Sequence, residues 1–433
     1  MKNAMKRLLT AVFALLFSPL ALAGVTIEHW TTAHGARVYF AASQALPIVD
    51  IQVDFAAGSM FDPADQAGLA ALTRATLDLG AGPRDENGIA EQLADLGARL
   101  GGGADHDRAS LSLRSLSSPE IREPALSILR DILRSPRFAP EIVAREQARS
   151  ATSLKDALTR PDTIASRAFW ASLYPQHPYG RQPTPDSINA LQRDDLLAFH
   201  ARHYTAANAS ITLVGDLSRA QAETIAQQLA EALPAGQPVN LPDAPEAPAG
   251  RSVAIAHPAS QAHVYLGLPA IERGHPDYFP LLVGNYTLGG GGFVSRLMKQ
   301  VRDQHGYAYS VYSYFAPLRQ SGPFQIGLQT KRSQAADAVK LAREILTDFV
   351  AQGPSADELA AAKANLTGSF PLRLDSNSKI LGNVAAIGFY GLPLDYLDLY
   401  QSKIQAVTVN QIKAAFSRHV PVDRLITLTV AAD

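Results

Sequence analysis

The sequence predicts an α+β protein made of two homologous α/β sandwich domains, each with an antiparallel-type sheet covered by helices. Three observations support this prediction. Segments with strand-like alternation are interleaved with long helical patterns, the same order of elements recurs in the second half of the chain, and a proline-rich stretch separates the halves. An alternating strand buries one face only, so a sheet of such strands needs helices to cover that face.

In the first half, alternating polarity predicts strands, and apolar residues spaced three and four apart predict helices. The expected strands are 37–40, 49–55, 110–116 and 209–214. The expected helices are 66–79, 121–133 and 142–157. Strands and helices therefore share this part of the chain.

The second half repeats this order. The expected strands are 264–268, 309–313 and 324–329, and the expected helices are 278–288, 293–302, 335–350 and 356–370. Three landmarks recur at nearly constant spacing: Gly68 with Gly284, Ile121 with Asp337, and Glu141 with Glu358. A repeated order at a fixed spacing indicates an internal duplication.

A linker is predicted between the halves, because five prolines occur there without apolar periodicity: Pro234, Pro238, Pro242, Pro245 and Pro248. Such a segment is extended and semi-rigid. We therefore expect an N-terminal domain over 24–233, a linker over 234–252 and a C-terminal domain over 253–433. A cleft between two domains is the usual place for a ligand.

The N-terminus has the pattern of a secretory signal peptide. Basic residues precede an apolar run over 8–17, and Ala21-Leu22-Ala23 forms a small-x-small cleavage signal. The apolar run is shorter than the roughly 20 residues that span a bilayer. The sequence thus predicts a signal peptide over 1–23, a periplasmic mature protein and no membrane anchor.

Composition excludes several classes of function. The 433 residues include 39 basic and 40 acidic side chains, a formal charge of −1, whereas a nucleic-acid binder needs a basic surface. Cysteine is absent, which rules out disulfides, thiolate metal sites, a cysteine nucleophile and a lipoprotein anchor. The glycine run at 289–292 is not followed by Gly-Lys-Ser/Thr, so it is not a phosphate-binding loop.

Several motifs occur together in a consistent order. They are the segments 58–62, 67–75, 177–180, 203–204, 214–216, 288–290, 295–297, 301–302 and 306–312. Together they resemble the pitrilysin/insulinase-type zinc metallopeptidases, the inverzincins, in their short processing-peptidase-like form. The resemblance covers nearly the whole mature chain and implies a two-domain peptidase fold.

The zinc motif of that family is missing. The resemblance places two His ligands and a Glu base, H-x-x-E-H, at Ala71, Arg74 and Ala75, and a third ligand at Ser153. Alanine has no lone pair to donate, and a guanidinium can neither bind Zn²⁺ nor accept a proton. Glu146 matches a carboxylate that the family keeps near the metal. We therefore expect no metal in this chain, and we expect Arg74 to reach the surface or to pair with Glu146 or an Asp.

The second half keeps other family residues. The resemblance implies that Arg302 and Tyr309 hold the substrate backbone beside a zinc ion across the cleft. It also implies that the glycine run at 289–292 is a flexible loop over the cleft, and that a peptide can add as a strand near 101–103. A guanidinium and a phenol can both donate hydrogen bonds to a peptide carbonyl or to an oxyanion.

Three hypotheses for function follow. In the first, the chain is inactive alone and is the non-catalytic, substrate-binding subunit of a periplasmic heterodimeric zinc metalloendopeptidase. Its partner would be a homologous H-x-x-E-H subunit that carries the zinc, and its substrate an unstructured peptide. In the second, the chain is a structural or peptide-binding module with no part in proteolysis. In the third, a relocated metal is bound by His200 and His203, or by the Asp105, His106 and Asp107 cluster.

Overall fold

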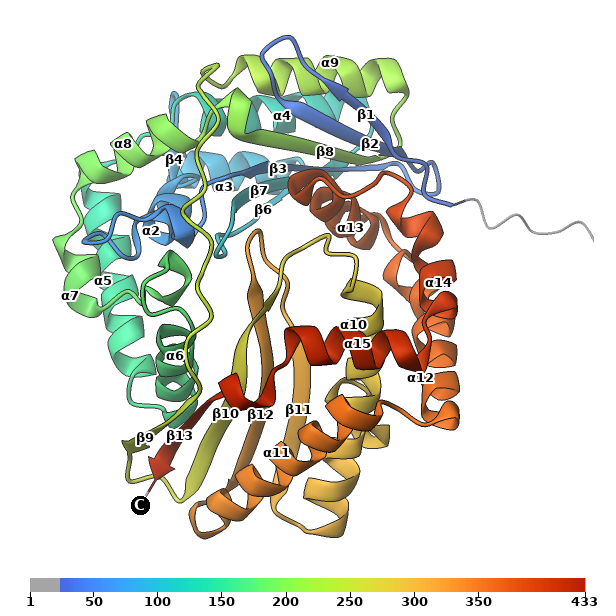
Figure 1. The fold of residues 1–433 in the computed structure, drawn as a ribbon. Coiled ribbons are helices and arrows are strands. Elements are labelled where there is room, and N and C mark those ends of the chain that lie inside the picture. The colour runs from blue at the N-terminus through green and yellow to red at the C-terminus, as the bar shows by residue number, and fades with distance from the viewer. Residues whose placement is uncertain (1–23, 433) are drawn as a thin grey trace, which may run out of the picture.

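The computed structural model describes residues 24–432, so the predicted signal peptide lies outside the described residues. Figure 1 shows two sheets, one from each half of the chain, with helices packed on them. Each half thus contains a sheet with a helical layer, as the sequence predicts.

The first sheet has six strands in the order β1-β2-β8-β3-β7-β6. The strands are β1 (Glu28–Thr31), β2 (Arg37–Ala42), β3 (Ile48–Phe55), β6 (Arg99–Gly101), β7 (Ala109–Leu116) and β8 (Ala209–Gly215). Their neighbours are antiparallel except for β2 and β8, which run parallel. Two short strands, β4 (Gly80–Ala81) and β5 (Arg84–Asp85), pair separately.

The second sheet has five strands in the order β11-β12-β10-β13-β9. They are β9 (Arg251–Ala256), β10 (Gln261–Ile271), β11 (Ala308–Phe315), β12 (Gly322–Lys331) and β13 (Ile426–Ala432). Again one neighbouring pair, β13 with β9, is parallel, and the other pairs are antiparallel. In both sheets the parallel partner of an early strand is the last strand of its half, as an internal duplication requires.

The helices of the first half are α2 (Leu69–Thr76), α3 (Glu86–Asp95), α4 (Pro119–Arg134), α5 (Pro140–Ala157), α6 (Pro161–Leu173), α7 (Pro185–Ala190), α8 (Arg193–His203) and α9 (Arg219–Glu231). Those of the second half are α10 (Tyr278–Asn285), α11 (Ala335–Gln352), α12 (Ala356–Gly368), α13 (Asn377–Tyr390), α14 (Tyr396–Ala406) and α15 (Val409–His419).

Helix α4 shows why these segments are helical. Pro119 occupies the first turn, where its missing N–H costs nothing. Ala125, Ile128, Leu129 and Ile132 are all buried, at spacings of three and four, so they form one apolar face against the sheet. Full burial of each such Ile or Leu side chain contributes roughly 1.5–3 kcal/mol.

One helix of each half packs on the sheet of the other half. Helix α6 packs on β13 and β10 of the second sheet, and α13 packs on β8, β3 and β2 of the first. In Figure 1 this places α13 beneath the first sheet and α6 beside the second. Residues 234–250 form no helix or strand and cross the front of the view between α9 and β9.

Two predicted helices differ from the structure. The segment 293–302 is not one α-helix: Gly292–Val294 is a 3-10 turn, and the backbone from Met298 to Gln304 is π-helical. The helix expected over 66–79 begins only at Leu69. Gly68 precedes it with a left-handed φ of 106°, whereas Gly284 lies inside α10, so these two glycines are not equivalent landmarks of the duplication.

Candidate functional site

Helix α2 carries the positions where the resemblance places a zinc ligand set. Asp62 fixes the start of this helix, because its carboxylate accepts hydrogen bonds of 2.8 Å from the N–H groups of Gly68 and Ala70. Ala71 and Ala75 lie one turn apart and are exposed. Their methyl groups offer no ligand atom, so the face that would hold a metal is apolar.

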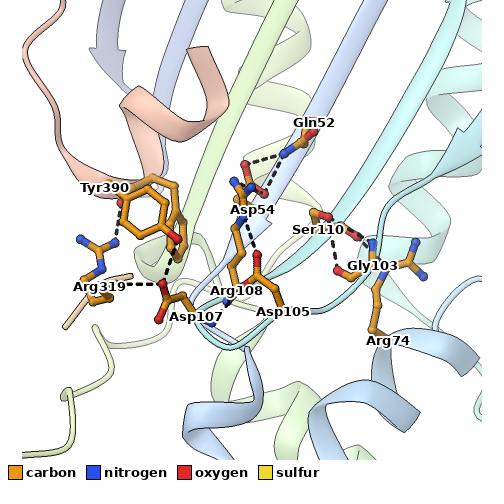
Figure 2. Close-up of polar contacts among 11 residues, drawn as sticks. Gln52, Asp54, Arg74, Gly103, Asp105, Asp107, Arg108, Ser110, Arg319 and Tyr390 are labelled. Atoms are coloured by element: carbon orange, nitrogen blue, oxygen red, sulfur yellow. Dashed lines mark hydrogen bonds and ion pairs between the residues drawn. The ribbon is translucent and has the colours of Figure 1, made fainter. Parts of the chain in front are cut away.

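Arg74 points the other way, into the protein. Its side chain is only 7% exposed; Nη1 lies 3.1 Å from Asp78 Oδ1. Nε donates to the carbonyl of Ser110 at 2.6 Å, and Nη2 donates to that of Gly101 at 2.8 Å. Figure 2 shows Arg74 beside the hairpin that contains Ser110. Of the three alternatives expected for Arg74, which were the surface, Glu146 or an Asp, the structure shows the pair with an Asp.

These contacts affect the edge of the first sheet. Gly101 ends β6, the edge strand, and its carbonyl is used by Arg74. Gly103 pairs with Ser110 through two backbone hydrogen bonds of 3.2 and 2.7 Å. The backbone groups of Gly101 and Gly103 that an added peptide strand would need are therefore already hydrogen-bonded, to Arg74 of α2 and to Ser110 of the same hairpin.

Helix α5 carries the remaining positions of the zinc site. Ser153 is exposed on this helix. Glu146 is buried, and its two carboxylate oxygens pair with Nε of Arg145 at 3.0 Å and with Nε of Arg149 at 3.2 Å. Two methyl groups, a cation and one hydroxyl do not form the His₂–carboxylate set that a catalytic zinc needs. The residues at these positions do not fit the ion.

The structure brings Arg302 and Tyr309 together in the second half. Tyr309 lies at the start of β11, where the pairing with β12 shifts register, and its side chain is 79% exposed. Cζ of Arg302 lies 5.0 Å from the centroid of the Tyr309 ring. Within residues 24–432, the Arg302 side chain has neither a hydrogen bond nor an ion pair, which leaves its N–H donors available.

Phe293 is a third member of this site that sequence reasoning missed. Its ring centroid also lies 5.0 Å from Cζ of Arg302, and the residue is 69% exposed. An aromatic residue directly after a glycine run was the available signal. We call Phe293, Arg302 and Tyr309 the Arg302 cluster.

Gly289, Gly290 and Gly291 are closely packed where a flexible loop was expected, whereas a Cβ atom on Gly292 would meet nothing within 4 Å. A Cβ atom on Gly289 would lie 2.4 Å from Oγ of Ser313, and one on Gly290 would lie 2.6 Å from Nδ2 of Asn285. The π-helical turn Tyr286–Gly290 thus presses its backbone against β11 and α10. Glycine is needed there for close approach rather than for mobility.

The histidines proposed for a relocated metal face different surroundings. Nδ1 of His203 lies 2.8 Å from the carbonyl of Ala56, while the His200 ring stacks on Tyr204 at 4.9 Å. Burial lowers the pKa of both His200 and His203 to about 4, so both rings are neutral at pH 7. They are packed side chains of α8.

The second candidate metal cluster is also dispersed. Asp105 pairs with Arg108 at 3.3 Å, His106 stacks on Trp170 at 4.4 Å, and Asp107 binds two tyrosines. Neither of the two predicted metal clusters is therefore assembled.

Within residues 24–432, only His275, Asp277 and His419 bring three potential ligand atoms within 4.8 Å of one another. Their atoms already have partners. Oδ2 of Asp277 binds Nε2 of His419 at 2.9 Å and also the guanidinium of Arg418. Nδ1 of His275 accepts the N–H of Asp277 at 3.0 Å. A salt-bridge network at the end of α15 accounts for this cluster.

A buried polar cluster joins the two halves at Asp107. Its carboxylate accepts hydrogen bonds from the hydroxyls of Tyr179 and Tyr390 and from the N–H of Arg319, the last two at 2.8 and 2.9 Å. Figure 2 shows Asp107 between its own hairpin and the residues of the second half. One carboxylate from the first half is thus satisfied largely by the second.

Asp54 lies close to this cluster and is fully buried. Burial raises its pKa to about 6, although Arg108 at 3.3 Å and the side-chain amide of Gln52 act to lower it. Its titration therefore falls close to neutral pH.

Known proteins match both halves of the chain. Residues 37–184 match the family described as Insulinase (Peptidase family M16), and residues 190–366 match the Peptidase M16 inactive domain. A crystal structure of a peptidase M16 inactive domain from Pseudomonas fluorescens is 38% identical, with a TM-score of 0.91, and the match covers 94% of this chain and 98% of that one. The chain belongs to the M16 peptidase family. Its N-terminal half lacks the residues of a catalytic M16 zinc site, and its C-terminal half matches the domain that the family description calls inactive.

Two other relatives help to place this M16 chain. The "Non-peptidase homolog YmxG" of Helicobacter pylori is 27% identical over 427 residues, which is 97% of each chain. The periplasmic protease PqqL of Escherichia coli has a TM-score of 0.80 at 17% identity, covering 94% of this chain and 46% of that protein, so it supports the fold alone.

Proposed function

We propose that this protein is the substrate-binding, non-catalytic subunit of a heterodimeric zinc metalloendopeptidase, paired with a homologous H-x-x-E-H subunit. One observation carries the proposal: the first half has no residues for zinc, while the second half keeps the Arg302 cluster, whose guanidinium has ring contacts but no hydrogen bond or ion pair among the described residues. Loss of one set and retention of the other favour a chain that assists chemistry performed elsewhere.

In this proposal, Arg302 and Tyr309 hold an extended, unstructured peptide at the zinc of the partner. The bound zinc would supply a hydroxide nucleophile at neutral pH. The guanidinium and the Tyr309 phenol would donate hydrogen bonds to the peptide carbonyl and to the oxyanion that forms when it is attacked. The exposure of Tyr309, 79%, fits a donor that must reach a ligand outside its own sheet.

The proposed location is the periplasm. The support is the signal-peptide pattern over 1–23. None of the helices in residues 24–432 is both long and apolar enough to cross a bilayer. We propose the same domain boundaries as above, with domains over 24–233 and 253–433 and a linker over 234–252.

The second candidate is a structural or peptide-binding module with no part in proteolysis. The matched name "Non-peptidase homolog YmxG" is compatible with it. The two candidates differ in whether the Arg302 cluster affects the rate of peptide cleavage in the presence of a zinc-bearing chain.

The test is co-expression with a zinc-bearing M16 chain encoded nearby, followed by cleavage of unstructured peptides with and without a chelator. We expect a stable heterodimer and chelator-sensitive cleavage. Tyr309→Phe, which removes one hydroxyl, should lower kcat by about a hundred- to a thousandfold, and so should Arg302→Ala.

Matched controls come from the same elements. Tyr314→Phe alters another exposed tyrosine of β11, and Lys299→Ala removes another cation near Arg302. Both should leave kcat unchanged. Equal rates for all four variants would contradict a role in cleavage and favour the structural module, and a chain that stays monomeric with its partner would contradict the heterodimer.

A further inference from the structure

Phe293 is an exposed aromatic residue held on a well-fixed turn. Its side chain is 69% exposed, and the neighbouring Val294 is 56% exposed. Solvent exposure of a Phe loses the free energy that burial would contribute. Burial therefore does not account for the position of the Phe293 ring.

The turn that presents Phe293 is fixed on both sides. Before it, Gly289 and Gly290 pack closely against Ser313 and Asn285. After it, Oγ of Ser295 donates to the carbonyl of Gly292 at 2.7 Å. Gly292 has a φ of 60°, which an L side chain rarely adopts. The position of Phe293 is therefore determined by the backbone rather than by burial of its ring.

The contact partner of this ring is the Arg302 guanidinium, 5.0 Å away, which also lies 5.0 Å from the Tyr309 ring. A cation is attracted to the face of an aromatic ring within about 6 Å. An arginine without hydrogen-bond partners has many rotamers of similar energy, and fixing it in advance saves the entropy that binding would otherwise cost.

We propose that Phe293 is a positioning residue: together with Tyr309 it holds the Arg302 guanidinium in the conformation that receives a carbonyl or carboxylate of an extended peptide. The proposal rests on the proposed function for the role of the peptide, but the ring contact itself can be measured in the isolated chain. The glycine run is then a means of placing the Phe293 ring over Arg302.

The experiment compares three variants of the full-length mature chain. Phe293→Leu keeps an apolar side chain but removes the ring, Phe293→Tyr restores a ring, and Val294→Ala is the control beside it. Nitrogen-15 NMR of the Arg302 side chain, assigned with Arg302→Lys, reports the ring contact. We expect the Arg302 Nε–H resonance to shift in Phe293→Leu and to stay near its original position in Phe293→Tyr and Val294→Ala.

The same variants are assayed in the heterodimer. Phe293→Leu should lower kcat/KM by about two- to fivefold, the size expected for an exposed cation–π contact, and Phe293→Tyr should restore it. An unmoved Arg302 resonance in Phe293→Leu would overturn the positioning role whatever the kinetics. If the resonance moves but Arg302→Ala cleaves at the original rate, the ring contact stands and the proposed function fails.

Discussion

Arg74 shows how one residue can change the use of a site. At the position of a general base, this chain has a permanent cation, which binds two carbonyls of the β6–β7 hairpin and Asp78. A buried charge is tolerated only when paired and hydrogen-bonded. Arg74 satisfies this condition and connects α2 to the edge of the sheet.

We predict that Arg74→Ala lowers the free energy of unfolding by about 2–4 kcal/mol, because two partly buried carbonyls and Asp78 lose a charged donor. Urea unfolding would measure the change. Arg160→Ala is the control, since Arg160 forms an exposed pair with Asp162 at 3.8 Å and one exposed hydrogen bond to Thr163 at 3.3 Å, and it should cost under about 0.5 kcal/mol. Similar losses for both variants would contradict the role of Arg74.

Asp54 gives a prediction for pH. Its pKa is raised to about 6 in the folded protein, above the value of about 3.9 in an unfolded chain. The folded state therefore binds more protons between these values, and the contribution of Asp54 to stability is greatest at low pH and is lost as the pH rises through 6.

The measurement compares wild type with Asp54→Asn, which does not titrate at this position. The unfolding free energy of wild type minus that of Asp54→Asn should increase by about 2 kcal/mol when the pH falls from 7 to 4. Taking the difference cancels the other groups that titrate in this range, such as Asp62, whose pKa burial also raises to about 6. A difference that does not change with pH would contradict the raised pKa.

At the scale of elements, the segment 286–304 departs most from regular structure. It consists of a π-helical turn, a 3-10 turn and a longer π-helix, and such π segments are frequent at functional sites. The glycines permit the first turn to press against β11. The rest of the segment then places Arg302 beside Tyr309, at the start of β11.

We predict that Gly289→Ala destabilises the protein by about 1–3 kcal/mol, because its Cβ would overlap the backbone and side chain of Ser313. Gly382→Ala is a matched control inside α13, where an added Cβ meets nothing within 4 Å. That change should stabilise the helix by about 0.5–1 kcal/mol. Thermal unfolding of both variants would measure these changes in stability. If Gly289→Ala left the stability unchanged, the turn would have room to move away from Ser313.

At the scale of the whole molecule, the two halves are joined by two helices, each packed on the sheet of the other half, and by one polar cluster. Helices α6 and α13 each pack on the sheet of the other half, and Asp107 accepts hydrogen bonds across the junction from the Tyr390 hydroxyl and the Arg319 N–H. The orientation of the Arg302 cluster relative to any partner therefore depends on this junction.

We predict that Tyr390→Phe, which leaves one oxygen of Asp107 with fewer donors, lowers the unfolding free energy by about 1–2 kcal/mol. It should also speed amide hydrogen exchange in α13. Tyr314→Phe is the control, because within residues 24–432 the Tyr314 hydroxyl makes no hydrogen bond. Unchanged exchange in α13 would show that helix packing alone holds the halves.

The sequence by itself determined the family, the α+β class and the loss of the zinc residues, because these depend on side-chain types at short, fixed spacings along single elements. Only the tertiary structure decided the partners of Arg74, the ring that faces Arg302 and the residues that satisfy Asp107. Asp107 and Tyr390 are far apart in the chain, and a contact at such separation depends on how helices cross and which way a backbone turn points a side chain. The packing of the glycine run is of the same kind: the family resemblance implied a flexible loop, whereas the close approach to β11 depends on where that strand lies in the fold.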